Sequence, residues 1–387
     1  MMDSATTVID VKLPVDSAQE VDDGLDTLAL LGEHLINSIL EQEPLPVLTS
    51  IIENGAPLWY QNQAEGISCL HAAAYIQDVD LVKLLVEKGA VWNSVDYLKH
   101  TAGDIALSFN NVDIYALIRD AGIRSELLLS RLSSQTSLQA TDSTTILRQA
   151  DNTGAGSLDT FLSSRLRFTV DGHGQSICSI DVEGEEIGVM MGWEAGIMQE
   201  TVRRLCQGHK NDKELKILNI GFGLGIIDTL FQSTRTRPTK HVIIEAHPDV
   251  LQHMKQLGWY DKEGVEILEG KWQDFIREEG LLGGNSFDVV YTDTFSEDYE
   301  ELHRFFKYLP MLFSGSGSRF SFFNGLGATN AMFYDVYTHI SELHLSQVGL
   351  DVEWSDVDVG ESRDSRWGSS RQYFSLPTYR LPIAKLR

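Results

Sequence analysis

The sequence predicts an α-helical repeat domain followed by an α/β domain whose sheet is doubly wound and mostly parallel. Two observations lead to this prediction. In the first third of the chain a helical pattern recurs at offsets of 33 and 34 residues, and beyond residue 215 short apolar runs alternate with segments of helical period. We therefore divide the chain into helical repeats with an N-terminal cap (1–125), a linker (126–164) and the α/β domain (165–387).

The repeats have the period and the motif of ankyrin units. Residues 81–90 (LVKLLVEKGA) recur at 114–123 (IYALIRDAGI), with an earlier copy at 47–56. Residues 68–73 (SCLHAA) match the opening of an ankyrin unit, and residues 101–106 are a degraded copy. The alternative is a set of unrelated amphipathic helices that happen to align.

Each second helix of a repeat is expected to bury one apolar stripe and to end at a glycine. The stripes consist of residues spaced at i, i+3 and i+4: Leu81, Leu84 and Leu85, then Ile114, Leu117 and Ile118. Gly89 and Gly122 are the expected C-terminal caps. A helix at 24–42 is expected to cap the stack.

Charge limits the choice of partners. The 31 basic and 56 acidic side chains give a net charge of −25, which disfavours direct nucleic-acid binding and suits a basic partner. No apolar run reaches the roughly 20 residues of a membrane span, and the N-terminus is acidic where a targeting peptide would be basic. We therefore expect a protein of the cytoplasm and nucleus.

The cysteines indicate neither a disulfide framework nor a metal site. Cys69, Cys178 and Cys206 form no CxxC pair and are too few for a zinc site. Free, buried thiols and no bound metal are therefore expected.

Residues 126–164 are rich in Ser, Thr, Gln and Gly, and predict a linker with one short helix. Beyond it, five strands are expected at 216–220, 241–246, 265–270, 287–293 and 319–324. Because helical segments separate them, these strands should form a parallel sheet that is covered on both faces.

A glycine-rich turn follows the first of these strands and predicts a nucleotide-like ligand. Gly221, Gly223 and Gly225 lead into a helix, and Glu245 ends the next strand, where a carboxylate can bind ribose hydroxyls. The spacing is GxGxG and lacks the third glycine of a dinucleotide site, so NAD is the lesser option. Asp293 ends a further strand, and two strand-end acids suit a cationic ligand such as the sulfonium of S-adenosylmethionine.

Six segments in order resemble guanidinoacetate N-methyltransferase: 189–200 (VMMGWEAGIMQE), 218–226 (LNIGFGLGI), 245–250 (EAHPDV), 268–274 (LEGKWQD), 291–297 (YTDTFSE) and 321–328 (SFFNGLGA). With the ankyrin-like repeats, the chain resembles the fungal protein-arginine methyltransferases that modify the internal δ-nitrogen of arginine, also called type IV. The resemblance implies a seven-stranded class I methyltransferase fold, S-adenosylmethionine as cofactor and a basic protein substrate. Ribosomal proteins are the substrate class that it suggests.

The resemblance also implies site residues. It places residues 221–226 against the methionine and ribose of the cofactor, Glu245 on the ribose diol, and Trp272 and Gln273 beside the adenine. The full cofactor-binding set is Phe168, Met190, Met198, Gly221, Phe222, Gly223, Leu224, Gly225, Ile226, Glu245, Ala246, His247, Trp272, Gln273 and Asp293. The substrate-binding set is Trp193, Glu194, Asp293 and Asn324.

Several of these residues have an ordinary structural alternative. Met190 and Met198 could simply fill the core, and Trp272 could pack there. Glu194 could be a solvated acid on a helix, and Asn324 could belong to a turn.

Glu194 and Asp293 are the expected catalytic residues. An arginine guanidinium has a pKa near 12.5 to 13.8, so its deprotonation at pH 7 costs roughly 8 kcal/mol. Carboxylates that only bind the cation raise that pKa further, so one of them must also accept a proton. We interpret the pair as a bidentate clamp, with Asp293 the better candidate for the base.

The sequence leaves other functions open. The alternatives are a small-molecule guanidino N-methyltransferase, a non-catalytic ankyrin scaffold that binds the cofactor, and, more distantly, a dehydrogenase. It reveals neither the substrate protein and its arginine nor the oligomeric state.

Overall fold

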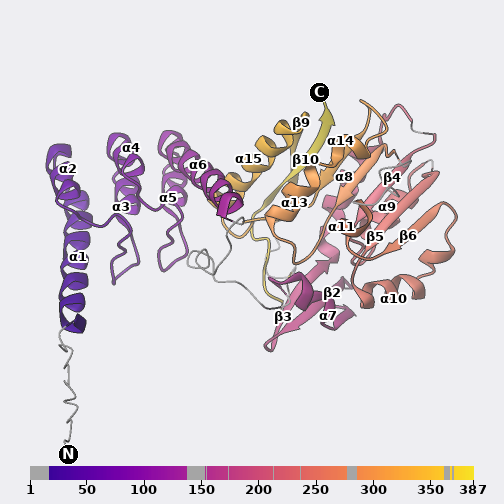
Figure 1. The fold of residues 1–387 in the computed structure, drawn as a ribbon, viewed down its shortest axis with the longest axis horizontal. Coiled ribbons are helices and arrows are strands. Elements are labelled where there is room, and N and C mark those ends of the chain that lie inside the picture. Colours follow the sequence, from indigo (N-terminus) through magenta and orange to yellow (C-terminus); the bar gives the residue numbers. More distant parts are fainter. Residues whose placement is uncertain are drawn as a thin grey trace, which may run out of the picture. The chain divides into compact units, whose positions relative to one another are not determined.

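Helix pairs make up the described part of the first unit of the chain, which spans residues 1–125. The structure is a computed structural model that describes residues 17–136 and 153–387, except 154, 173, 212, 236, 277–285, 361–366, 368 and 369. The pairs are α1 (Ser17–Leu40) with α2 (Leu45–Glu53), α3 (Cys69–Tyr75) with α4 (Val79–Glu87), and α5 (Ala102–Ser108) with α6 (Val112–Thr136) (Figure 1). The helix expected at 24–42 is α1.

The apolar stripes predicted for the second helices are confirmed at their centres. Leu81 and Leu85 of α4 are completely buried, as are Ile114 and Ile118 of α6, while Leu84 and Leu117 are half-buried. One helix alone cannot bury such a stripe, so the stack is the unit of stability.

His71 explains why the ankyrin motif has a histidine at this position. Its Nδ1 lies 2.8 Å from the hydroxyl of Ser68, the residue that caps α3, and its Nε2 lies 3.1 Å from the carbonyl oxygen of His100. The ring therefore joins the start of one repeat to the loop that begins the next. Thr101 and Asp104 form the equivalent capping box of α5 without a histidine.

The prediction that Gly122 ends a helix is wrong. Helix α6 continues through this position to Thr136, and a Cβ at Gly122 would lie 2.8 Å from the Trp92 ring. The glycine is therefore needed for close packing and not as a cap. Gly89, at φ +91°, does follow the end of α4 in the left-handed conformation.

The segment expected as a linker contains more helix than the sequence indicated. Residues 126–136 belong to α6, and residues 158–163 form α7 (Leu158–Ser163). Residues 137–152 lie outside the described part of the chain.

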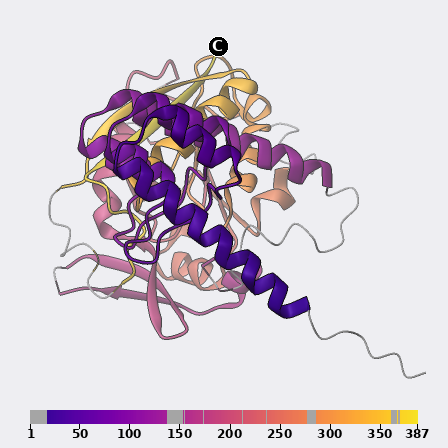
Figure 2. The same ribbon diagram turned by 90° about the vertical axis from the view of Figure 1, so that its left-hand side faces the viewer.

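The second unit, residues 126–387, contains two sheets (Figures 1 and 2). The smaller is antiparallel and consists of β1 (Leu166–Val170), β2 (Ser176–Val182) and β3 (Glu185–Met191). The larger has seven strands in the order β6-β5-β4-β7-β8-β10-β9, as the resemblance implied. Its strands are β4 (Lys216–Ile220), β5 (Lys240–Glu245), β6 (Val265–Glu269), β7 (Val289–Thr292), β8 (Arg319–Phe322), β9 (Leu350–Asp358) and β10 (Thr378–Leu386).

Strands β4 to β8 pair in parallel, and β10 is antiparallel to both β8 and β9. The described helices of this unit after α7 are α8 (Ala195–Cys206), α9 (Ile226–Gln232), α10 (Pro248–Gln256), α11 (Trp272–Ile276), α13 (Tyr299–Phe306), α14 (Leu309–Leu312) and α15 (Ala331–Gln347), with short 3₁₀ turns η1 (Gly192–Glu194) and η2 (Trp259–Asp261).

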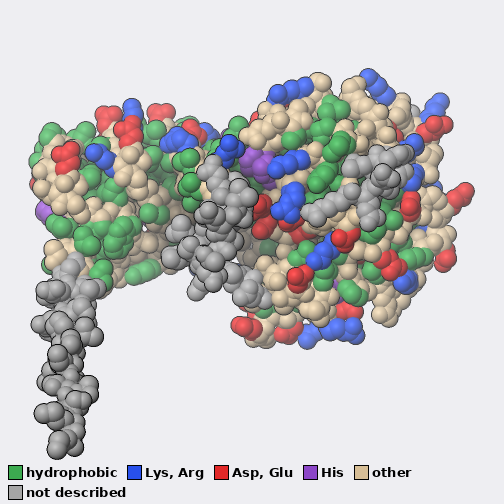
Figure 3. Space-filling model, viewed as in Figure 1, with side chains coloured by type: hydrophobic (Ala, Val, Ile, Leu, Met, Phe, Trp, Pro, Cys, Tyr) green, Lys and Arg blue, Asp and Glu red, His purple; other side chains and the backbone are tan. Residues whose placement is uncertain are grey.

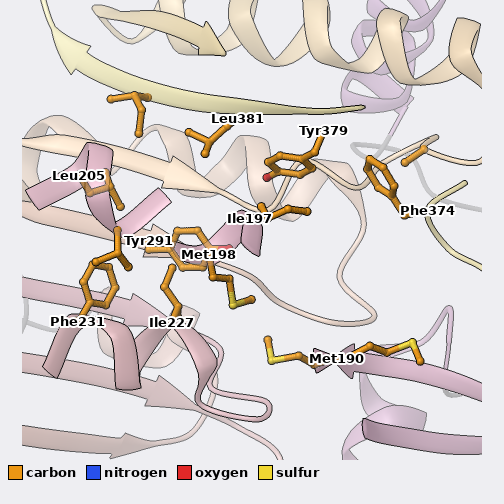
Figure 4. Close-up of a cluster of buried hydrophobic side chains, with 14 of the residues drawn as sticks. Met190, Ile197, Met198, Leu205, Ile227, Phe231, Tyr291, Phe374, Tyr379 and Leu381 are labelled. Carbon is orange, nitrogen blue, oxygen red and sulfur yellow. The ribbon is translucent and has the colours of Figure 1, made fainter. Parts of the chain in front are cut away.

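The large sheet is covered on both faces, because neighbouring strand residues enter different cores. Ile217 of β4 packs with Met198 of α8 and Phe231 of α9, whereas Leu218 packs with Phe305 of α13. Figure 4 shows the first of these clusters. Because helices pack on both faces of the central strands, a ligand can reach these strands at their ends.

The cysteines are free thiols. Cys69 and Cys178 are buried, as expected, while Cys206 is half-buried. Among the described helices none combines the length and the apolar character that a bilayer crossing requires.

Candidate active site

A cavity of about 390 Å³ lies at the carboxyl ends of the parallel strands β4 to β8. Its walls also include residues of α7, β3 and the C-terminal segment. The lining residues predicted from the sequence are Met190, Glu194, Gly221, Gly223, Glu245, Ala246, Trp272, Asp293 and Asn324.

The glycine turn after β4 lies so close to its neighbours that a side chain could not be accommodated. Gly221 has φ +89°, and a Cβ there would lie 2.0 Å from the carbonyl oxygen of Asp293. A Cβ at Gly223 would lie 2.8 Å from the Sδ of Met190, which accepts a hydrogen bond from the Leu224 N–H at 3.2 Å. The turn is therefore packed between β3 and the end of β7, and its backbone forms part of the cavity wall.

A buried polar network supports this turn from below. The Asn219 Nδ2 donates to the Gly221 carbonyl oxygen and to the Asp228 Oδ1, each at 2.8 Å. Asp228 Oδ1 lies 3.0 Å from the His241 Nε2, and all three side chains are completely buried. The sequence analysis did not identify this network, which joins β4, α9 and β5 beneath the turn.

Glu245 joins the glycine turn to the end of β5. One carboxylate oxygen accepts from the Phe222 N–H at 2.8 Å, and the other accepts from the His247 N–H at 2.7 Å. Burial raises the pKa of this carboxyl, while the backbone donors lower it. The side chain is 8% exposed and lines the cavity, so a carboxylate is present where a ribose diol would be bound.

Glu194 lies in the cavity wall and is not a solvated helix acid. Its side chain is 2% exposed, and its Oε1 accepts a 2.8 Å hydrogen bond from the Met191 N–H and another from the Tyr373 hydroxyl. No partner of Oε2 is found among the described residues. That oxygen is therefore available to a ligand.

Asp293 contributes a second carboxylate to the same cavity. Its backbone N–H bonds to the Ile220 carbonyl oxygen at 2.9 Å, which fixes the end of β7 against β4. Its Oδ2 is enclosed and finds no hydrogen-bond partner in the described part of the chain. An enclosed carboxylate oxygen without a donor is costly and calls for a ligand that can donate.

The two carboxylates interact electrostatically. Burial raises the pKa of Glu194, and the negative charge of Asp293 raises it further. Burial also raises the pKa of Asp293. A cation bound between the two carboxylates would offset the cost of burial and the repulsion between them, because an opposite charge favours the ionised form of both acids.

Trp272 is both a core residue and a wall residue. Its ring is 4% exposed and packs edge-on against Phe305, while its Nε1 donates to Glu297 at 3.0 Å. The Gln273 Nε2 donates to the same carboxylate at 2.9 Å, but Gln273 itself is not one of the lining residues. Glu297 and Trp272 line this end of the cavity, together with Phe295 and with Phe161 of α7.

The remaining predicted residues lie behind the wall. Phe168 stacks on His253 with ring centroids 4.2 Å apart, and Met198 is completely buried among the core residues of α8. Neither is among the residues that line the cavity, so their part in binding the cofactor stays a prediction. Phe222, Leu224, Gly225, Ile226 and His247 hold the turn and α10 in place, and Trp193 packs on Trp367.

Asn324 lines the cavity, but its amide nitrogen is directed into the protein. The Nδ2 lies 3.2 Å from the Tyr334 hydroxyl, from the Thr338 hydroxyl and from the Arg380 carbonyl oxygen. These contacts fix the loop after β8 against α15 and β10.

The sequence analysis missed several parts of the wall, among them α7 and the segment that contains Tyr373. Phe161 belongs to α7, in the segment interpreted as a linker, and its carbonyl oxygen lies 3.0 Å from the His247 Nε2. Tyr373 lies in a stretch without any motif. Only the apolar spacing of Leu158, Phe161 and Leu162 could have indicated α7.

Comparison with known proteins identifies the family. The family model of guanidinoacetate N-methyltransferase matches residues 175–343, and a model of ankyrin repeats matches residues 38–86. "Protein arginine N-methyltransferase 2" of Cryptococcus neoformans var. neoformans serotype D is 40% identical over 392 residues, covering 97% of this chain and 99% of the relative. The protein of the same name from Saccharomyces cerevisiae is 34% identical over 327 residues, covering 79% of this chain and 77% of the relative.

The chain belongs to the protein arginine N-methyltransferase 2 family. It is an enzyme that methylates arginine in proteins, and its methyl donor is S-adenosylmethionine. When bound, S-adenosylmethionine supplies a methyl group activated by a sulfonium.

The cavity of this family member fits S-adenosylmethionine. The close-packed turn at Gly221 and Gly223 allows backbone approach, and Glu245 offers a carboxylate to a ribose. The enclosed Oδ2 of Asp293 suits the neighbourhood of a positive charge. In the described residues no cluster of three or more His, Cys, Asp or Glu could hold a metal ion.

Proposed function

We propose that this enzyme methylates the internal δ-nitrogen of an arginine in a ribosomal protein, with Glu194 and Asp293 as the clamp for the guanidinium. One observation carries the proposal: the buried carboxylate of Glu194 and the half-buried carboxylate of Asp293 line one cavity, and each has an oxygen that accepts from no donor among the described residues. A guanidinium presents five N–H donors in a plane and can satisfy both.

The clamp supports the choice of nitrogen. Carboxylates that engage the N–H groups of the two terminal nitrogens hold the plane of the guanidinium by its outer edge. The internal nitrogen then remains as the one available to accept a methyl group. The resemblance to type IV enzymes leads to the same nitrogen.

The clamp also supplies the proton acceptor. Formation of the new N–C bond requires that the guanidinium lose one proton. Asp293 lies at the end of β7, beside the glycine turn, and is the better placed acceptor. Glu194 then holds the cation in position through Oε2.

The repeat unit is proposed as the docking surface for the substrate. Large hydrophobic side chains are exposed on it, among them Trp59, Tyr97 and Leu98. Figure 3 shows hydrophobic side chains, in green, on the visible surface of the repeat unit. The net charge of −25 favours a basic polypeptide, and ribosomal proteins are basic. A cytoplasmic and nuclear location fits such a substrate, and a fluorescent fusion would test it.

The clamp is tested with conservative amide variants. The substrate is ribosomal protein from cells that lack the gene of this enzyme, so that the target arginine is unmethylated. Glu194→Gln and Asp293→Asn should each abolish methyl transfer to this substrate, while calorimetry shows that S-adenosylhomocysteine still binds. Glu245→Ala should mainly weaken the binding of S-adenosylhomocysteine. Glu266→Gln and Asp351→Asn are matched controls on exposed acids that form surface ion pairs.

Fragmentation of the labelled peptide then identifies the modified nitrogen. δ-Methylarginine is the expected product. Label on a terminal nitrogen would overturn the choice of nitrogen, and label on guanidinoacetate but on no protein would indicate a small-molecule enzyme. Near-normal activity of both amide variants would eliminate the clamp.

A further inference from the structure

The hydrogen bonds of Glu194 divide its two oxygens between different tasks. Oε1 accepts from the Met191 N–H and from the Tyr373 hydroxyl, so its lone pairs are used within the protein. Oε2 has no partner among the described residues, and Glu194 lines the cavity. The carboxylate plane is thereby fixed with one oxygen toward the ligand.

Tyr373 is held in place independently of Glu194. The Arg371 N–H donates to the Glu186 carbonyl oxygen at 3.0 Å, and the Ser375 N–H donates to that of Ala328 at 2.9 Å. The segment therefore joins β3 to the loop after β8. A Cβ at Gly188 would lie 3.3 Å from the Tyr373 ring, so the absence of a side chain there lets the ring approach β3.

Aromatic packing completes the support. The centroid of the Trp193 ring lies 5.9 Å from that of Tyr373 and 5.3 Å from that of Trp367. The Trp367 and Tyr373 rings pack edge-on with their centroids 4.6 Å apart. This packing gives Trp193, expected to bind substrate, a different role. It supports the ring whose hydroxyl reaches Glu194.

We propose that Tyr373 is a positioning residue for arginine methylation, which commits Glu194 Oε1 to the protein and leaves Oε2 to bind the substrate guanidinium. The inference rests on the proposed clamp. Tyr373 was not among the residues predicted from the sequence, and its contribution comes through Glu194 and not through contact with the reacting atoms.

The hydroxyl has an electrostatic consequence as well. Burial and the negative charge of Glu194 raise the pKa of Tyr373 well above its ordinary value, so its proton is retained. Its hydrogen bond favours the ionised form of Glu194 and lowers the pKa of that carboxyl. Among the described residues, the charge of Asp293 also raises the pKa of Glu194, and the charge of Glu194 contributes to the raised pKa of the buried Tyr291 and Tyr379.

The test is Tyr373→Phe, which removes the hydroxyl and keeps the ring. Loss of a hydrogen bond to a charged group should lower kcat/KM for the ribosomal protein fraction about 10- to 100-fold near neutral pH. The acid limb of the pH profile should move to higher pH, so the deficit shrinks as the pH is raised across about pH 6 to 9. Affinity for S-adenosylhomocysteine should be unchanged.

Tyr260→Phe is the matched control. Tyr260 also donates to a glutamate, Glu269, at 2.6 Å, but it lies outside the cavity lining. This variant should have wild-type kinetics and an unchanged pH profile.

Two results would overturn the proposal. One is wild-type activity of Tyr373→Phe, and the other is a loss of activity with an unshifted pH profile or with equally weakened cofactor binding, which indicates a merely structural role. Glu194→Gln is measured alongside. If that variant is active, the clamp itself fails; if it is inactive while Tyr373→Phe is normal, only the role of Tyr373 fails.

Discussion

Glu194 is buried in a site that raises its pKa, and this has a consequence for stability. Unfolded glutamate ionises near pH 4.3, whereas the folded protein holds this proton to higher pH because of burial and of the charge of Asp293. The folded state binds more protons in that interval, so the carboxyl lowers the free energy of unfolding as the pH rises.

We therefore expect Glu194→Gln to stabilise the ligand-free protein at alkaline pH. The gain should be roughly 1–3 kcal/mol at about pH 8 and should vanish near pH 4, where the carboxyl is protonated in both states. Thermal unfolding of wild type and variant as a function of pH measures it. A variant that is less stable than wild type at pH 8 would contradict the electrostatic origin.

At the scale of single residues, the sequence allowed prediction of the acids but not of their partners. Glu194, Glu245 and Asp293 follow from motifs, because a strand end or a recognisable segment fixes each of them. Tyr373 reaches Glu194 from a position 179 residues away in sequence. A contact of that kind depends on tertiary packing, which no local pattern reports.

The glycine turn is the element that joins the cofactor region to the clamp. Gly221→Ala should be strongly destabilising or should abolish cofactor binding, because φ is +89° and the new Cβ would lie 2.0 Å from the Asp293 carbonyl oxygen. Calorimetry with S-adenosylhomocysteine and thermal unfolding measure the two effects.

Gly196→Ala is the control for that substitution. Gly196 lies in α8, its φ lies outside the left-handed region, and a Cβ there would meet no atom within 4 Å. This change should stabilise the protein by about 0.5–1 kcal/mol. Equal effects at both glycines would show that steric contact at Gly221 is not the cause.

Whole elements were predicted well where the hydrophobic period is clear. The five central strands and the second helices of the repeats are confirmed, because a buried face imposes its period on the sequence. Helix α6 shows the limit of this reasoning: Gly122 resembles a cap, but Trp92 packs against it and the helix continues. The small β1–β3 sheet was not predicted at all.

At the scale of the whole molecule, the proposed docking role can be tested on the two loops that connect the helix pairs, residues 54–68 and 88–101, here called the fingers. Tyr97 and Leu98 of the second finger are 66% and 76% exposed, and the Tyr97 N–H bonds to the Glu65 carbonyl oxygen of the first finger at 2.9 Å. Replacement of both by Ser should raise KM for the protein substrate several-fold, by analogy with interface side chains worth about 1 kcal/mol or more.

Leu30→Ser is the control, since Leu30 of α1 is 72% exposed but lies outside the fingers. It should leave KM unchanged. The cofactor KM should not change in either variant. If both variants change the KM for the protein substrate to the same extent, the fingers have no special part in docking.

Among the residues that the structure describes, no basic side chain pairs with the two acids in the cavity. Lys271, the one basic residue in the described lining, forms an ion pair with Asp159 at 2.8 Å. If the two acids clamp a guanidinium as proposed, the substrate brings a positive charge to them, so selection should depend on charge as much as on shape. Citrulline has nearly the outline of arginine but is neutral, and a peptide carrying it in place of the target arginine should neither react nor compete.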